Sequence, residues 1–117
     1  MKRRFFPKLE HLKKSDEIGV LFKRGNSVAC WGAKLYFARN TREYNRIAYA
    51  LPRKFGNAVR RNRARRWGRE AWRHLRHKLE AGFDLVLLVF PDETADYQRR
   101  FTQFENLLRK ARILNDG

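Results

Sequence analysis

One stretch of this chain, residues 53–78, limits most strongly what the chain can fold into. Its sequence is RKFGNAVRRNRARRWGREAWRHLRHK, with eleven Lys and Arg residues and one acid, Glu70, so it carries ten of the chain's sixteen net positive charges. Gly56 and Asn57 form a sharp turn at its start, and Asn57 has the short polar side chain of a helix N-cap. Apolar residues then recur at helical spacing, which predicts a long helix from about residue 57 to residue 79.

The predicted helix has two unlike sides, as a wheel with about 100° per residue shows. Small and apolar side chains form a stripe on one side, which consists of Ala64, Trp67, Gly68, Ala71, Trp72, Leu75 and Leu79. A second stripe consists of Asn62, Arg65, Arg66, Arg69, Arg73 and Arg76. The first side is therefore predicted to pack against a core, with both Trp residues buried, while the second side is a ridge of guanidinium groups.

The arginine ridge favours an anionic partner. Cations at i, i+4 spacing on a helix repel one another by a few tenths of a kcal/mol per pair, and Glu70 is the single acid available to offset this. A solvated charged face is the alternative interpretation, but such faces usually mix Glu with Lys. Arg presents a planar fork that can donate two hydrogen bonds to one phosphate, so the composition favours a nucleic-acid-binding face.

The whole-chain composition describes one small folded domain. The 117 residues include 43% hydrophobic residues and 14% aromatic ones, enough for one modest core and too many for a disordered basic tail. The high net charge points to nucleic acid rather than to a membrane surface, because Arg interrupts every wide apolar face. No apolar run approaches the roughly 20 residues of a membrane span. With no secretory signal and a lone Cys30, the sequence predicts a cytoplasmic protein with no internal disulfide.

The remaining pattern predicts a mixture of helices and strands around the long helix. In order, we expect a basic irregular arm at residues 1–14, a short helix ended by Gly25, a strand over 28–38 bent or split near Gly32, a strand over 46–51, the long helix, a strand over 83–90 buried on both faces, and a helix over 97–114. A strand–helix–strand step usually joins parallel neighbours with a right-handed crossover.

Alternation and periodicity also assign faces within two of these elements. In the strand over 28–38, side chains alternate between two faces. One face is expected to carry Trp31, Ala33, Leu35 and Phe37, and the other Lys34, Tyr36 and Ala38. The last helix is expected to turn inward Phe101, Phe104, Leu107, Leu108 and Ala111. It is expected to turn outward Arg99, Arg100, Arg109, Lys110 and Arg112.

Aromatic residues beside cations suggest a second binding surface. Tyr36 and Lys34 project away from the core side of their strand, and Ile18 and Phe22 on the first helix would flank the same face. Such a combination suits a groove for unpaired nucleotides, because bases stack on rings while cations neutralise the backbone. The alternative, that Ile18 and Phe22 only pack the helix onto the sheet, is equally consistent with their spacing.

Catalytic motifs are absent from the sequence. There are no paired carboxylates, no nucleophile elbow and no phosphate-binding glycine loop. His74 and His77 have a spacing that can share a metal, but no further ligand stands at a suitable distance in sequence, and Cys30 has no matched His. We therefore predict no catalytic residue and no metal ligand in this chain.

Residues 54–70, KFGNAVRRNRARRWGRE, resemble the signature of the bacterial ribonuclease P protein family. That signature combines a Lys, a Gly-Asn-Ala-Val start, an Arg-Asn-Arg triplet, a basic pair and an Arg-Glu. The similarity extends to Leu12-Lys13-Lys14, to residues 21–25, to Leu35-Tyr36, to Asp84-Leu85-Val86 and to the last helix. Nearly the whole chain is thus covered.

The resemblance implies an α+β fold, a single αβββαβα domain over residues 1–117 with the basic arm at its start. Its mixed sheet would contain a left-handed βαβ crossover around the long helix, against the right-handed rule, as in a domain of a small-subunit ribosomal protein and of elongation factor G. The implied function is that of the non-catalytic protein subunit of ribonuclease P. In that ribonucleoprotein a catalytic RNA holds Mg²⁺ and removes the 5′ leader of precursor tRNA. No obligate protein partner and no membrane are implied.

Residue by residue, the resemblance assigns two sites. The face that lies against the catalytic RNA becomes Lys54, Arg61, Asn62, Arg63, Arg65, Arg66 and Arg69. The leader-binding cleft becomes Ile18, Phe22 and Tyr36. Ile18 stands where the family generally carries Phe, and Gly68 is an unexpected helix-weakening residue within the motif. A ribosomal protein and a self-sufficient nuclease are the competing hypotheses, and the motif favours neither.

Overall fold

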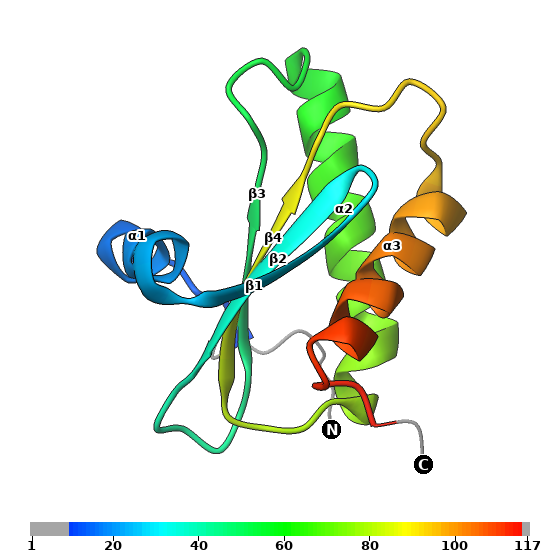
Figure 1. The fold of residues 1–117 in the computed structure, drawn as a ribbon. Coiled ribbons are helices and arrows are strands. Elements are labelled where there is room, and N and C mark those ends of the chain that lie inside the picture. Colours follow the sequence, from blue (N-terminus) through cyan, green and yellow to red (C-terminus); the bar gives the residue numbers. More distant parts are fainter. Residues whose placement is uncertain (1–9, 116–117) are drawn as a thin grey trace, which may run out of the picture.

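A four-stranded sheet separates the helices of this protein into two unequal layers (Figure 1). The structure is a computed structural model that describes residues 10–115, so the first nine residues of the predicted arm lie outside it. In chain order the elements are α1 (Ser15–Arg24), β1 (Asn26–Cys30), β2 (Ala33–Arg39), β3 (Arg46–Ala50), α2 (Ala58–Leu75), the 3-10 turn η2 (Arg76–Lys78), β4 (Phe83–Val89) and α3 (Tyr97–Lys110). This order confirms the αβββαβα prediction.

The strand order in the sheet is β1-β2-β4-β3. β1 pairs with β2 and β2 pairs with β4 in antiparallel fashion, whereas β3 and β4 are parallel. The sheet is therefore mixed, and its parallel neighbours are joined through α2, as expected. The left-handed sense of this crossover stays a prediction.

β4 is the central strand, and both of its faces are covered. Leu85 and Leu87 point to the side of α2 and α3, where they join the large core cluster, while Val86 points to the side of α1. All three are at most 4% exposed. This two-sided burial explains why the sequence of β4 is an almost continuous apolar run instead of an alternating pattern.

The two faces of the sheet differ in how completely they are covered (Figure 1). α2 and α3 pack on one face around the buried side chains of Trp72, Leu75, Phe104, Leu107 and Leu108. On the other face, which we call the α1 face, α1 contributes one buried side chain, Leu21, that packs with Leu12 and Val86. A ten-residue helix with one buried anchor leaves part of this face uncovered.

The long helix is shorter than predicted but starts where expected. The Asn57 side chain accepts a hydrogen bond from the backbone N–H of Arg60 at 2.9 Å, which confirms the N-cap. The regular helix ends at Leu75, and the chain continues as η2 to Lys78.

Gly68 has a low helix propensity, and its presence in α2 is explained by packing against the sheet. The Tyr49 hydroxyl of β3 donates a hydrogen bond to the Gly68 carbonyl at 3.1 Å. A Cβ at residue 68 would lie 2.7 Å from the Tyr49 ring. The glycine therefore lets α2 approach the sheet closely.

Two side-chain orientations predicted from the pattern are wrong. Trp31 belongs to the turn between β1 and β2 and is 70% exposed, because the strand splits one residue before Gly32 instead of continuing its alternation. Arg100 faces inward and is 7% exposed. Its guanidinium donates to the carbonyls of Phe90 at 2.7 Å and Gly32 at 3.3 Å, so it fastens α3 to the ends of two strands.

The described end of the N-terminal arm is attached to the sheet and to α2. His11 forms a parallel bridge with Ile47, and the Leu12 N–H donates to the Ile47 carbonyl at 3.0 Å, along the outer edge of β3. Glu10, 9% exposed, accepts hydrogen bonds from Trp72 Nε1 at 2.9 Å and from Arg76 Nε at 2.8 Å. These contacts cover the edge of β3, which would otherwise present unpaired backbone groups.

Candidate nucleic-acid interface

The cationic side of α2 faces solvent along most of its length. Asn62, Arg63, Arg66 and Arg69 are exposed on the helix, and Lys54 is exposed in the segment that precedes it. Arg65 is half-buried. The structure therefore places six of the seven predicted residues of this face at or near one solvent-facing side of α2. We call this surface the α2 face.

The seventh predicted residue, Arg61, also has a structural role. Its guanidinium Nη1 donates to the Pro52 carbonyl at 2.9 Å and to the Arg53 carbonyl at 3.5 Å. Arg61 thereby holds the segment that leads from β3 into α2, and this segment carries Lys54. Part of its hydrogen-bonding capacity is already used within the protein.

Charge compensation on the α2 face is sparse: Asp92 and Glu93 share a hollow with Arg60 and Arg63 near the start of α2, and Glu70 lies toward its other end. Glu70 accepts a hydrogen bond from Arg73 and lies 3.2 Å from His74 Nε2. The hydrogen bond from Arg73 holds the pKa of the Glu70 carboxyl below its ordinary value. The guanidinium of Arg63 lies 5.2 Å from the centre of the Trp67 ring, which orients it without neutralising it. The cations of the α2 face therefore outnumber the acids beside them.

The three residues predicted for the second site meet on the α1 face. The rings of Phe22 and Tyr36 contact each other edge to face, with their centres 4.7 Å apart. The Lys34 ammonium lies 4.9 Å from the centre of the Tyr36 ring. Ile18 is half-buried and packs beside Leu21. An aromatic pair and a cation thus lie together on this face, as expected from the sequence.

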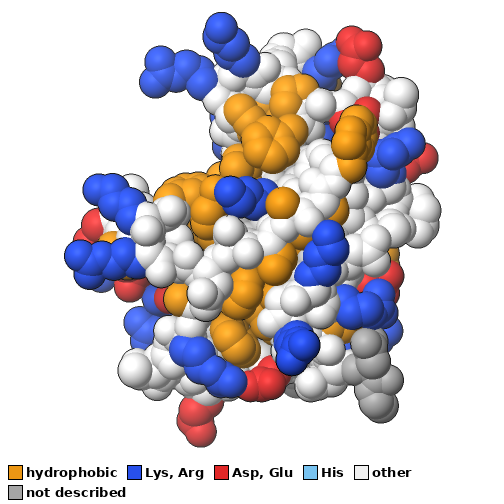
Figure 2. Space-filling view, in the orientation of Figure 1, with side chains coloured by type: hydrophobic (Ala, Val, Ile, Leu, Met, Phe, Trp, Pro, Cys, Tyr) orange, Lys and Arg blue, Asp and Glu red, His pale blue; other side chains and the backbone are white. Residues whose placement is uncertain are grey.

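The α1 face combines anchoring with exposure, so its apolar residues do not serve packing alone. Ile18 contributes to packing, whereas Phe22 keeps 39% of its surface exposed. In the space-filling view the surface is hollowed beside the α1 lobe, and hydrophobic side chains reach the surface there among Lys and Arg (Figure 2). The neighbouring positions of β3 on this face are the small residues Ala48 and Ala50. Small side chains therefore lie beside the Phe22–Tyr36 pair and Lys34 on this face.

An ion-pair network fixes the position of α1 on this face. Arg46 of β3 donates to both carboxylate oxygens of Asp84 at 2.8 and 2.7 Å, and its guanidinium lies 3.4 Å from Glu17 of α1. Burial alone would raise the pKa of Asp84, but hydrogen bonds from Arg46 and Asn40 outweigh it and hold the pKa below its ordinary value. Asp84 therefore stays ionised and keeps β4, β3 and α1 in register.

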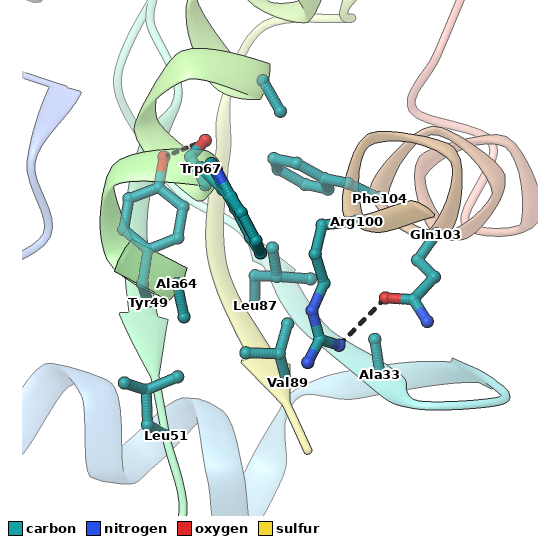
Figure 3. Close-up of a pocket in the computed structure, with 12 residues that line it drawn as sticks. Ala33, Tyr49, Leu51, Ala64, Trp67, Leu87, Val89, Arg100, Gln103 and Phe104 are labelled. Carbon is teal, nitrogen blue, oxygen red and sulfur yellow. Dashed lines mark hydrogen bonds between the residues drawn. The ribbon is translucent and has the colours of Figure 1, made fainter. Parts of the chain in front are cut away.

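The cavity beneath α2 is a packing gap and not a ligand site (Figure 3). It lies between Tyr49, Trp67, Leu87 and Phe104, with the Arg100 side chain crossing from α3, and has room for only about 20 Å³ of solvent. Burial raises the pKa of the Tyr49 hydroxyl and lowers that of Arg100. Both groups donate hydrogen bonds within the protein, Tyr49 to the Gly68 carbonyl and Arg100 to the Phe90 carbonyl.

Within residues 10–115, no three His, Cys, Asp or Glu side chains lie together in a way that could hold a metal ion. Over the same residues, no helix is long and apolar enough to cross a membrane.

Two structurally important residues escaped the sequence analysis. Arg100 was counted among the outward cations, although it stands four residues before Phe104 on the buried stripe of α3, and this spacing was the available signal. Glu10 joins Trp72 and Arg76 across more than sixty residues, and no local pattern marks such a contact.

These features define a small basic α+β protein with a cationic helix on one side of its sheet and an aromatic cleft beside a short helix on the other. A sequence model of the family described as Ribonuclease P matches residues 6–112. The ribonuclease P protein component of Natranaerobius thermophilus is 33% identical over 88% of this chain and 90% of its own length. That of Pelotomaculum thermopropionicum is 42% identical over 74% and 77%.

Solved structures of RNase P proteins resemble this chain as well. The RNase P protein from Thermotoga maritima superposes with a TM-score of 0.76 at 30% identity, covering 86% of this chain and 96% of that one. A Staphylococcus aureus RNase P protein mutant reaches a TM-score of 0.84 over 92% of each chain at 23% identity, which shows the shared fold. The chain belongs to the ribonuclease P protein family, and a place in tRNA processing follows from that membership.

Proposed function

We propose that this chain is the protein subunit of a ribonuclease P ribonucleoprotein. In this proposal the α2 face binds the catalytic RNA, and the α1 face binds the single-stranded 5′ leader of precursor tRNA. The RNA cuts the tRNA at its mature 5′ end. The protein supplies binding and orientation in the cytoplasm and no reacting group.

The observation that carries the proposal is the separation of two unlike surfaces by one sheet. The α2 face presents cations with little compensation, which suits a folded RNA with dense phosphate. The α1 face presents Phe22 and Tyr36 beside Lys34, which suits unpaired bases. Two different nucleic acids can therefore be held at once on opposite sides of a rigid domain.

The proposal assigns Mg²⁺ to the RNA. Glu17 and Asp84 near the α1 face and Glu70 on α2 each lie within 4 Å of an Arg, and Asp92, in the hollow beside the start of α2, lies 3.7 Å from Arg99. Such pairing leaves these carboxylates poorly suited to metal binding. The protein would lower the Mg²⁺ requirement because its cations replace part of the counterion charge around the assembled RNAs.

The test is precursor-tRNA cleavage at low Mg²⁺ by a bacterial ribonuclease P RNA, with and without the full-length protein. We expect stimulation, cleavage at the mature 5′ end, and no cleavage by the protein alone. Binding to the RNA without stimulation would move a ribosomal or general RNA-binding role ahead. Cleavage by the protein without RNA would revive the hypothesis of a self-sufficient nuclease.

A further inference from the structure

Trp31 is an exposed aromatic residue held on a fixed turn. It is 70% exposed at the tip of the β1–β2 hairpin. Gln103 of α3 donates to the Trp31 carbonyl at 3.0 Å, and Arg100 donates to the Gly32 carbonyl at 3.3 Å. Gly32 has φ = 87° and a Cβ there would lie 2.7 Å from Gln103, so the turn fits closely against α3. The indole is therefore presented to solvent by a rigid support.

The side chain of Arg99 orients the Trp31 ring. The Arg99 guanidinium lies 5.9 Å from the ring centre, and its Nε lies 3.7 Å from the Asp92 carboxylate. This chain of contacts leaves most of the indole surface without a protein neighbour. Exposed Trp residues of this kind are enriched where a partner binds.

A groove lies between this turn and α3, which we call the Trp31 groove. It has a volume of about 530 Å³, within the roughly 300–1,000 Å³ typical of sites for small planar ligands. Its walls include Trp31, Thr94, Gln98, Arg99, Thr102 and Asn106. Hydroxyl and amide groups can both donate and accept hydrogen bonds, as the edges of a nucleobase require. Arg99 and Asp96 both line the groove, and Arg99 also lies 3.7 Å from the Asp92 carboxylate, so the groove carries no excess of positive charge and a base fits it better than a phosphate.

The loop at residues 91–96 lies between the Trp31 groove and the α2 face. On its other side is a second hollow whose walls include Arg60, Arg63 and Trp67 of α2. Pro91, Asp92, Glu93 and Ala95 line that hollow, whereas Thr94 and Asp96 line the Trp31 groove. An RNA strand on the first turns of α2 would thus have a short path across this segment to Trp31. Both hollows lie on the α2 and α3 side of the sheet, away from the α1 face.

We infer that the Trp31 groove receives an unpaired base of the same RNA that the α2 face binds, stacked on the indole of Trp31. This inference rests on the proposed function, because it takes the catalytic RNA as the source of the base. Stacking on a fixed aromatic ring adds affinity that does not depend on charge, whereas the arginines of α2 supply the salt-dependent part.

The test uses the full-length protein and a bacterial ribonuclease P RNA, with tryptophan fluorescence quenching by acrylamide as one readout. Trp72 is buried and Trp67 half-buried, so Trp31 is the most accessible tryptophan to the quencher. We expect saturating RNA to protect this accessible emission, and the Trp31→Phe protein to lack the protected component. If Trp31 stays equally quenchable in the complex, the inference is wrong.

Affinity measured over a series of salt concentrations provides the second readout. Trp31→Ala should weaken RNA binding about 5- to 100-fold at every salt concentration without changing the slope against salt. Trp31→Phe should stay within about threefold of the wild type because a ring is retained. Val20→Ala, which removes an exposed apolar side chain from α1, serves as the matched control and should bind like the wild type.

The outcomes separate this inference from the proposed function. If the wild-type protein fails to bind the RNA, the proposed function fails. If it binds and stimulates cleavage but Trp31→Ala binds equally well, only the inference fails. If Trp31→Ala weakens the binding of precursor tRNA but not of mature tRNA, the stacked base belongs to the leader, and the assignment to the catalytic RNA is wrong. If the wild-type protein self-associates with rising concentration and Trp31→Ala does not, while the affinity for RNA is unchanged, Trp31 is a contact between two copies of the protein and the inference is wrong.

Discussion

Gly68 of α2 packs directly against the ring of Tyr49 in the sheet. Ala there would improve helix propensity by about 1 kcal/mol, but its Cβ would lie 2.7 Å from the Tyr49 ring. Overpacking of this kind costs about 1–3 kcal/mol. We expect Gly68→Ala to lower the free energy of unfolding by about 1 kcal/mol, measured by urea denaturation.

The same substitution in α1 provides the control for Gly68→Ala. A Cβ at Gly19 would meet no atom within 4 Å, so Gly19→Ala should raise the free energy of unfolding by about 0.5–1 kcal/mol. In a Tyr49→Ala background the clash is gone, and Gly68→Ala should then become stabilising. A destabilising effect that persists without the Tyr49 ring would contradict the packing argument.

Substitution of Tyr36 tests whether a single aromatic ring on the α1 face contributes to leader binding. If bases stack beside Phe22 and Lys34, Tyr36→Ala should weaken the binding of precursor tRNA to the holoenzyme about 5- to 50-fold, with mature tRNA unaffected. Tyr36→Phe should retain most of the affinity because it keeps the ring. Equal losses for precursor and mature tRNA would show that Tyr36 acts elsewhere.

The lowered pKa of Asp84 predicts how the free energy of unfolding changes at low pH. Its pKa is lowered in the folded protein by hydrogen bonds from Arg46 and Asn40, which outweigh the effect of burial. A lowered pKa stabilises the fold above the unfolded value, near 3.9 for Asp, and this stabilisation is lost as the pH falls through the folded value. Urea denaturation between pH 6 and pH 3 should therefore show a smaller loss of stability in Asp84→Asn than in the wild type. Asp16→Asn, at the exposed start of α1, should keep the wild-type dependence.

At the scale of elements, Glu10 joins the N-terminal arm to α2. It accepts hydrogen bonds from Trp72 and Arg76, whose side chains are buried and about three-quarters buried. Glu10→Ala would leave both donors unsatisfied, so we expect a loss of about 2–3 kcal/mol in the free energy of unfolding.

A double-mutant cycle checks the Glu10 contact. Arg76→Ala should reduce the cost of Glu10→Ala by about 1 kcal/mol or more, because the two changes remove the same interaction. Additive effects would mean that the arm is held by the backbone pairing of Leu12 with Ile47 instead.

The elements themselves were largely predictable from the sequence, because their periods are local. The helical stripe of α2, the apolar run of β4 and the caps Gly25 and Asn57 all depend on neighbours within a few residues. Trp31 and Arg100 were misplaced because their environments are set by α3 meeting the β1–β2 turn, a contact across about seventy residues. The residues predicted for the α2 face, and those predicted for the α1 face, lie together because each set lies mainly on one or two continuous elements.

At the scale of the whole molecule, the net charge of +16 should govern affinity for RNA. Each phosphate that the protein neutralises releases counterions, so the logarithm of the binding constant falls linearly with that of the salt concentration. Arg65→Ala with Arg66→Ala should reduce this slope by about 1–2 and weaken binding to the catalytic RNA, with the fold intact by circular dichroism.

The matched control for this double substitution removes two cations elsewhere. Arg39 and Arg42 are exposed near the start of β4, at the opposite end of the sheet from the start of α2. Their joint replacement by Ala should change the slope less. Equal effects of the two double variants would show that the protein acts as a diffuse positive charge and not through the α2 face.

The place of β4 between β2 and β3 bears on how the chain is made. β2 and β3 follow one another in sequence, yet they are not neighbours in the sheet, and the strand between them begins only at Phe83. In a chain that grows from its N-terminus, β2 and β3 therefore lack the strand that pairs with both of them until α2 and β4 have been synthesised. Pairings between segments so distant in sequence form slowly. The sheet can close only after the most cationic part of the protein has been synthesised, so in the proposed function RNA can meet α2 before the domain beneath it is complete.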